Sequence, residues 1–165
     1  MDSEEYKHKV REQLLAYDFV EVSVDDIEEG NEPLNEDDRE IIEENELFLR
    51  DRGSHIEEVL IAQIRSESVE DLKSLLIKFL EVDESELFHE EYRVYILLIS
   101  ESATKAMKTV AKRYAVEEWP AYILPVLVGI KDESFTHHEK TGILKSVTTL
   151  HSMEKTAAEY FTIQE

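Results

Sequence analysis

Residues that make turns are scarce in this chain, and this scarcity restricts its fold more than any other feature. Among 165 residues there are only four Gly and three Pro. An all-β sandwich or barrel needs many turns, which Gly and Pro commonly supply. Helices need fewer turns, so the composition favours a helical protein. Hydrophobic residues make up 42% of the sequence, enough for a folded core although 35% of the residues are charged.

Apolar residues recur at helical spacing through most of the chain. A helix is predicted over 3–16, with Ser3 as its N-cap, and another from Asn35 to about Arg50. Further helices are predicted over 54–64, 69–80, 86–99, 103–114 and from Met153 onward. The alternation in 19–24 fits a short strand, although no partner strand is evident from the sequence.

A short internal repeat supports the helical interpretation. Ser66-Glu67-Ser68 and Ser100-Glu101-Ser102 lie 34 residues apart, and Leu150-His151-Ser152 is a weaker third copy. Periods near this length with paired helices are typical of α-solenoids. The sequence therefore predicts an all-α fold of antiparallel helical hairpins stacked as an array. The alternative is an α/β fold with strands near 93–99 and 121–128, because β-branched and aromatic residues dominate the first of these segments.

The segment from Trp119 to Asp132 contains a Leu-Pro pair, Leu124-Pro125, followed by Val126, Leu127 and Ile130 and then by Asp132. This pattern resembles the first helix of a HEAT repeat, in which Pro125 would kink the helix. The Val-Arg pair of that family's second helix is replaced here by His137-His138-Glu139. We accordingly expect one domain over 1–165, with acidic N-terminal helices and a loop over 1–52 and HEAT-like repeats over 53–165.

A second resemblance concerns the segment from Phe79 to Ala103. Its Leu-rich helix end, acidic turn and His89-Glu90 pair are similar to those of HEAT-like immunity proteins from bacterial polymorphic-toxin systems. The resemblance implies a small acidic cytoplasmic protein that binds and neutralises a cognate toxin. The N-terminal residues do not form a signal-peptide pattern, which agrees with a cytoplasmic location.

Acidic residues are distributed unevenly. The net charge is −21, and residues 1–52 carry 19 acids against 6 bases, whereas residues 102–165 carry 8 of each. Such a charge repels phosphates, so we expect neither nucleic-acid binding nor membrane binding. A basic protein partner, namely a toxin domain and possibly a nuclease, is the expectation instead. The predicted partner-binding residues are Asp25, Asp26, Glu28, Glu29, Glu36, Asp37, Asp38, Glu43, Glu44, Glu46 and an exposed Trp119.

Sequence patterns for catalysis are weak. The chain has no cysteine, no Gly-x-Ser-x-Gly elbow and no phosphate-binding loop. Two His-Glu pairs, His89-Glu90 and His138-Glu139, resemble the iron-binding pairs of the HEAT-repeat hydroxylase that acts on deoxyhypusine. That family has four such pairs and this chain has two, so we expect no metal, no other cofactor and no enzymatic activity.

The functional hypothesis from the sequence is thus an acidic binding module, most concretely an immunity protein for a basic toxin. Three alternatives stay open: a DNA mimic that inhibits a DNA-binding protein, a general HEAT-like scaffold, and a His-Glu metal enzyme or unrecognised α/β hydrolase.

Overall fold

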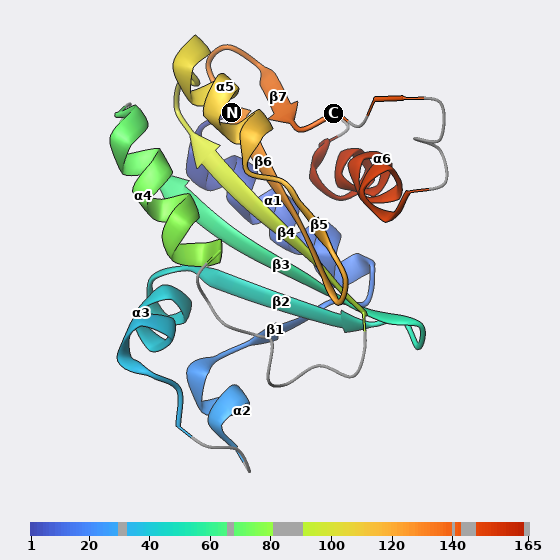
Figure 1. Ribbon diagram of the computed structural model, residues 1–165. Helices are drawn as coiled ribbons and strands as arrows, with labels where there is room; N and C mark the ends of the chain where they lie inside the picture. Colours follow the sequence, from blue (N-terminus) through green and yellow to red (C-terminus); the bar gives the residue numbers. More distant parts are fainter. Residues whose placement is uncertain (30–32, 66–67, 81–90, 140, 143–147, 164–165) are drawn as a thin grey trace.

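A seven-stranded mixed β-sheet forms the centre of the computed structural model (Figure 1). The structure describes residues 1–29, 33–65, 68–80, 91–139, 141–142 and 148–163. The strands are β1 (Val20–Val22), β2 (Glu46–Asp51), β3 (His55–Ile64), β4 (Glu91–Ser100), β5 (Val116–Glu118), β6 (Ala121–Gly129) and β7 (Ser134–His137). They are ordered β1-β2-β3-β4-β6-β5, and β7 also pairs with β6.

Helices cover both faces of this sheet. They are α1 (Ser3–Ala16), α2 (Val24–Glu28), α3 (Glu36–Glu44), α4 (Val69–Leu80), α5 (Lys105–Arg113) and α6 (Thr149–Phe161). α1 and α6 contribute to the hydrophobic cluster on one face, and α3, α4 and α5 contribute to the cluster on the other. The fold is therefore a three-layer α/β/α arrangement.

Three adjacent parallel strands, β3, β4 and β6, run through the middle of the sheet. Successive residues of β4 enter opposite clusters: Tyr95 and Leu97 pack beneath α1 and α6, whereas Ile96 and Leu98 pack beneath α4 and α5. All four side chains are at most 1% exposed. A strand buried on both faces needs apolar residues at every position, which explains the uninterrupted apolar runs in β4 and β6.

The predicted all-α fold is therefore wrong, and the α/β alternative is correct. The two strands of that alternative correspond to β4 and β6, while the helix predicted over 54–64 is β3. The helix predicted from Asn35 ends at Glu44, after which β2 begins. Continuous apolar runs of this kind do not show the alternation of a half-exposed strand, so periodicity alone does not distinguish them from buried helices.

The HEAT-like array and its repeats are overturned by the same finding. Pro125 does not kink a helix but lies within strand β6, opposite Ile96 of β4. On the other edge of β6, β5 pairs with residues 121–123 and β7 pairs with residues 126–129. Pro125 thus lies beside the gap between those two partners, where a strand can accommodate a residue without an N–H donor.

Several local predictions are confirmed. Helices do form over most of the segments assigned to α1, α4, α5 and α6. Asn35 caps α3 by accepting a hydrogen bond from the Asp38 backbone N–H at 2.8 Å. One cap prediction is wrong: α1 is capped by Asp2 and not by Ser3, because the Asp2 carboxylate accepts a hydrogen bond from the Glu5 backbone N–H at 2.8 Å. The short strand predicted within 19–24 is β1, and its partner is β2.

Asp132, which the HEAT resemblance placed in a helical turn, instead follows β6 and anchors the start of α5. Its carboxylate accepts the Ala103 N–H at 3.1 Å and lies 2.6 Å from the ammonium group of Lys108. The Lys108 contact is the largest cause that holds the pKa of Asp132 well below its ordinary value. A Cβ on Gly129 would lie 2.1 Å from an Asp132 oxygen and 2.8 Å from the Cβ of Ala103, so this position requires Gly.

Gly129→Ala is expected to destabilise the fold by about 1–3 kcal/mol, because the new methyl group overlaps both neighbours. Urea denaturation should show a lower transition midpoint with an unchanged slope. Thr109→Ala, an exposed change on α5, is the control and should shift the stability by no more than about 0.5 kcal/mol. Equal midpoints for the Gly129 variant and the wild type would contradict the close packing described here.

Asp132→Asn is expected to lower the free energy of unfolding at neutral pH by about 1 kcal/mol, a modest value for a partly exposed ion pair. The pKa of Asp132 is depressed in the folded protein. The stability that the Asp132 ion pair contributes is therefore complete above the ordinary aspartate pKa of 3.8 and is lost as the pH falls below that value. Denaturation curves at pH 7, 4 and 3 should therefore converge for the two proteins as the pH falls. A constant difference would contradict the ion pair.

Candidate functional site

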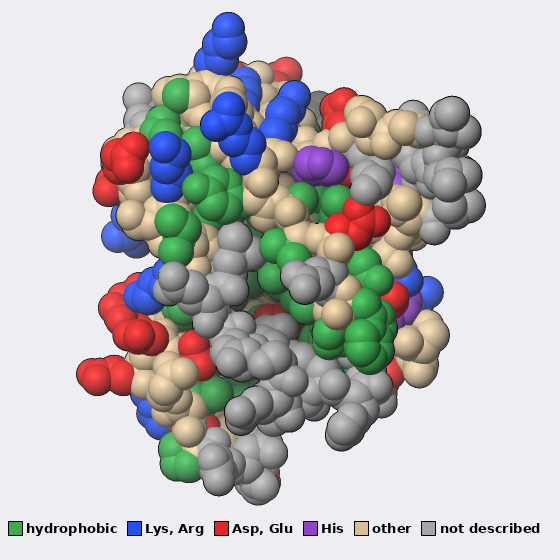
Figure 2. Space-filling view, in the orientation of Figure 1, with side chains coloured by type: hydrophobic (Ala, Val, Ile, Leu, Met, Phe, Trp, Pro, Cys, Tyr) green, Lys and Arg blue, Asp and Glu red, His purple; other side chains and the backbone are tan. Residues whose placement is uncertain are grey.

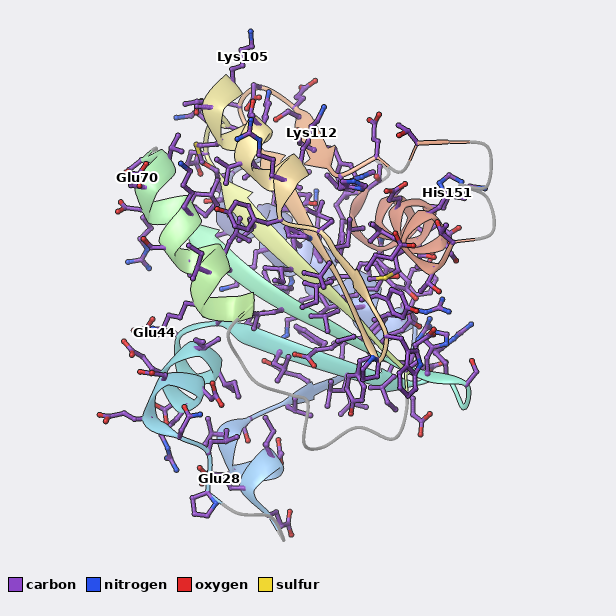
Figure 3. All side chains as sticks on the ribbon, in the orientation of Figure 1. Glu28, Glu44, Glu70, Lys105, Lys112 and His151 are labelled. Carbon is purple, nitrogen blue, oxygen red and sulfur yellow. The ribbon has the colours of Figure 1, made fainter. Side chains whose placement is uncertain are left out.

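Exposed carboxylates gather on α2 and α3, in the segment that connects β1 to β2. The α2–α3 acidic surface is defined here by Asp25, Asp26, Glu29, Glu36, Asp37, Glu40, Glu43 and Glu44, all of which are exposed. Figure 3 places Glu28 and Glu44 on the same side of the molecule as Glu70 of α4. In Figure 2, acidic side chains line that side, whereas Lys and Arg gather over α5. Most of the predicted acidic residues, though not all of them, thus lie on these two helices.

Some of these acids also stabilise the helices that carry them. Asp26 forms a capping box with Ser23, whose backbone and side-chain hydrogen bonds lower the pKa of Asp26. Asp38 bonds to the side chain of Asn35 at the start of α3. Acidic residues in the first turn also interact favourably with the positive end of the helix dipole.

Basic residues compensate only part of this charge. Arg39 is the single Lys or Arg in the sequence from residue 24 to residue 44. It forms ion pairs with Glu28 and, at 3.7 Å, with Glu43. Lys78 of α4 reaches Glu40 at 3.3 Å. These contacts leave the outer carboxylates Asp37 and Glu44 without a Lys or Arg partner among the residues that the structure describes.

Two predicted partner-binding residues lie elsewhere. Glu46 begins β2 and binds Lys7 of α1 at 3.0 Å, so it belongs to the packing of α1 against the sheet. Trp119 lies between β5 and β6, at the sheet edge opposite β1, and is 63% exposed. The structure therefore does not place Glu46 or Trp119 within the α2–α3 acidic surface.

One of the two His-Glu pairs noted in the sequence can be located in the structure. His138 contacts Glu154 of α6, at 3.2 Å, rather than its sequence neighbour Glu139. His151 contacts the other oxygen of Glu154 at 3.3 Å. His89 and Glu90 lie outside the described residues. Within the described ranges, no group of three or more His, Asp or Glu side chains is arranged to hold a metal ion.

Sequence reasoning missed a buried polar network between β2, β3 and α6. Arg50 binds Glu57 at 2.8 Å, and the Tyr160 hydroxyl donates to the other Glu57 oxygen at 2.7 Å. The Arg50 guanidinium also lies 4.9 Å from the centre of the Phe19 ring. Burial and the bond to Glu57 raise the pKa of Tyr160. The sequence has two adjacent acids here, Glu57 and Glu58, in a segment whose pattern predicts a helix, and nothing in it indicates which of the two is buried.

This network is fully partnered, and its chemistry is structural. Each Glu57 oxygen accepts a hydrogen bond, and the guanidinium donates to Glu57, to Tyr160 and to the Tyr17 carbonyl oxygen. A buried carboxylate is tolerated under these conditions because its lost hydration is replaced by charge-assisted bonds. We therefore assign the network to the attachment of α6 to the sheet.

Arg50→Ala is expected to cost about 3–5 kcal/mol of stability, because it leaves the Glu57 carboxylate buried without its principal partner. Tyr160→Phe should cost less, about 1–3 kcal/mol, since it removes the two hydrogen bonds of the hydroxyl but leaves the Arg50–Glu57 ion pair in place. Thermal and urea denaturation would measure both values. Arg113→Ala on the exposed side of α5 provides a matched control with a change below about 0.5 kcal/mol. If Arg50→Ala lost no more stability than this control, a structural role of the buried network would be excluded.

Comparisons with known proteins give no further guidance. No family model matches the chain, no curated protein matches it, and no solved structure matches its fold. The resemblance to HEAT-like immunity proteins is therefore corrected on two grounds: the fold is α/β, and no such family is found. Among the described residues, no helix is long and apolar enough to cross a membrane.

Proposed function

We propose that this protein is a binding module whose α2–α3 acidic surface docks on a basic surface of a partner protein. The observation that supports the proposal most is the concentration of exposed carboxylates on two adjacent helices that carry one Arg. The proposal needs no chemical step and no cofactor. It concerns the charge of the partner and does not depend on the HEAT resemblance.

The position of the acidic surface in the fold also supports binding. α2 and α3 are anchored by a few buried residues, including Val24 and Ile41, while their carboxylates point outward. Apolar residues such as Ile41 attach these helices to the hydrophobic cluster beneath them. The exposed carboxylates of α2 and α3 have no part in that core. A like-charged surface of this kind destabilises the isolated protein through self-repulsion, a cost that a cationic partner offsets.

Charge complementarity predicts a specific kinetic behaviour. Exposed charges steer a partner toward the surface and raise the association rate more than they raise the final affinity. Salt screens this attraction over a distance of about 10 Å at 0.1 M. The association rate should accordingly fall as the ionic strength rises.

The proposal also includes a cytoplasmic location. The chain has no cysteine, and cytoplasmic proteins do not depend on disulfides.

The test compares two triple variants that remove equal charge. Glu29→Gln, Asp37→Asn and Glu44→Gln neutralise three carboxylates of the α2–α3 acidic surface and leave the N-cap residues Ser23 and Asn35 unchanged. Glu4→Gln, Glu12→Gln and Glu139→Gln neutralise exposed acids elsewhere. Proteins captured from a cell extract by the wild type are identified, purified and titrated against all three proteins. We expect the α2–α3 variant to associate about tenfold more slowly at low salt, while the control variant stays within about twofold.

A partner that binds both triple variants with equal rates would refute a role for the α2–α3 acidic surface. A partner without a basic surface would do the same. Circular dichroism of the three proteins shows whether the fold is retained, so a loss of structure is distinguished from a loss of binding.

A further inference from the structure

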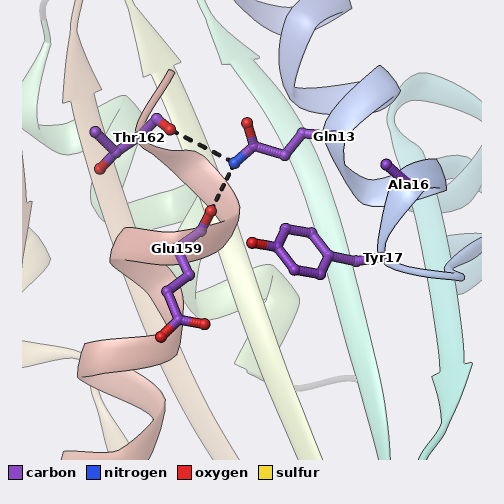
Figure 4. Close-up of a pocket in the computed structure, with 5 residues that line it drawn as sticks. All are labelled: Gln13, Ala16, Tyr17, Glu159 and Thr162. Atoms are coloured by element: carbon purple, nitrogen blue, oxygen red, sulfur yellow. Dashed lines mark hydrogen bonds between the residues drawn. The ribbon is translucent and has the colours of Figure 1, made fainter. Parts of the chain in front are cut away.

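A cavity of about 420 Å³ lies where α1 and α6 end side by side (Figure 4). Its lining consists of Gln13, Ala16, Tyr17, Glu159 and Thr162. Cavities of this size accommodate small ligands or a single long side chain. The cavity is on the α1–α6 face of the sheet, whereas α3 packs on the other face, so it is separate from the α2–α3 acidic surface.

The electrostatic character of the cavity is negative. Both helices present their carboxyl ends there, and each helix end carries a partial negative charge. The last turns of α1 and α6 contain no basic residue that would compensate this charge. Glu159 adds a full negative charge, and it has no ion pair among the residues that the structure describes. Three sources of negative potential therefore converge on one cavity.

The remaining lining residues are held in place by hydrogen bonds and ring packing. The Gln13 amide nitrogen donates to the backbone oxygens of Glu159 at 2.6 Å and Tyr160 at 2.9 Å. The Tyr17 ring is 36% exposed and packs against Tyr160 with a centroid separation of 5.2 Å. An aromatic face in such a position favours cations.

Arg50, a cation that reaches one lining residue of the cavity, is already neutralised. Arg50 donates to the Tyr17 carbonyl oxygen, but its guanidinium pairs with the buried carboxylate of Glu57 at 2.8 Å. Its charge therefore does not cancel the potential of Glu159 and the two helix ends.

We propose that the cavity between the ends of α1 and α6 binds an organic cation, an alkylguanidinium or alkylammonium group. Glu159 supplies the counter-charge, and Tyr17 supplies the aromatic face. The cation is carried either by a small molecule or by an Arg or Lys side chain of a peptide, and both sources share this chemistry.

The full chain is titrated with n-butylguanidinium, n-butylammonium and the neutral isostere n-butylurea by isothermal calorimetry. We expect both cations to bind, and n-butylurea to bind at least tenfold more weakly. Glu159→Gln should weaken cation binding about fivefold. Tyr17→Leu, which keeps an apolar side chain, should weaken it about threefold. Glu4→Gln, at the opposite end of α1, is the charge-matched control and should bind as the wild type does.

Equal binding of n-butylurea and n-butylguanidinium would overturn the proposal, as would unchanged affinity in Glu159→Gln. Circular dichroism establishes that each variant is folded. A competition arm uses acetyl-Gly-Arg-Gly-amide against n-butylguanidinium. If the peptide displaces n-butylguanidinium at an equal or lower concentration, the site is supported and the natural cation is assigned to a peptide side chain. If n-butylguanidinium binds but the peptide does not displace it, the site is supported and the natural cation is assigned to a small molecule. The α2–α3 triple variant should retain cation binding, which separates this test from that of the proposed function.

Discussion

Three adjacent parallel strands impose the main constraint on this structure. Because β3, β4 and β6 are buried on both faces, each face needs its own layer of helices. The crossover helices α4 and α5 lie on the same face, in keeping with the common handedness of such connections. The other face is consequently left to α1 and α6. These two helices are bound together by the Tyr6 hydroxyl, which donates to the Phe161 carbonyl oxygen at 2.6 Å.

Both proposed binding features follow from this division. α2 and α3 occur between β1 and β2, where the chain makes an antiparallel connection and no crossover helix is needed. Their outer residues are therefore free to be acidic. On the other face, α1 and α6 end near each other, and the cavity forms between their carboxyl ends. Binding at either place would leave the central sheet unaltered.

The buried charges illustrate how tertiary contacts assign roles. Glu57 is one of 39 acidic residues, and the sequence does not distinguish it from the exposed ones. Only the pairing of β2 with β3 and the docking of α6 bring Arg50 and Tyr160 to its two oxygens. Likewise, His138 and His151 are separated in the sequence, yet both contact Glu154 because β7 ends beside α6. The neighbours His138 and Glu139 resemble a metal-binding pair in the sequence, but His138 contacts Glu154 instead.

The sequence by itself determined the elements whose signals are local. The amphipathic helices α4 and α5, the cap at Asn35 and the acidity of α2 and α3 depend on neighbouring residues, and these were predicted correctly. Whether the apolar runs in β3, β4 and β6 become helices or strands depends on what covers them, because burial on both faces removes the alternation that identifies a strand. The tertiary structure alone decided that these runs pair as a parallel sheet and that Pro125 lies beside the gap between β5 and β7. It also decided which carboxylates are buried. These outcomes require residues far apart in the chain to meet, so local sequence patterns do not determine them.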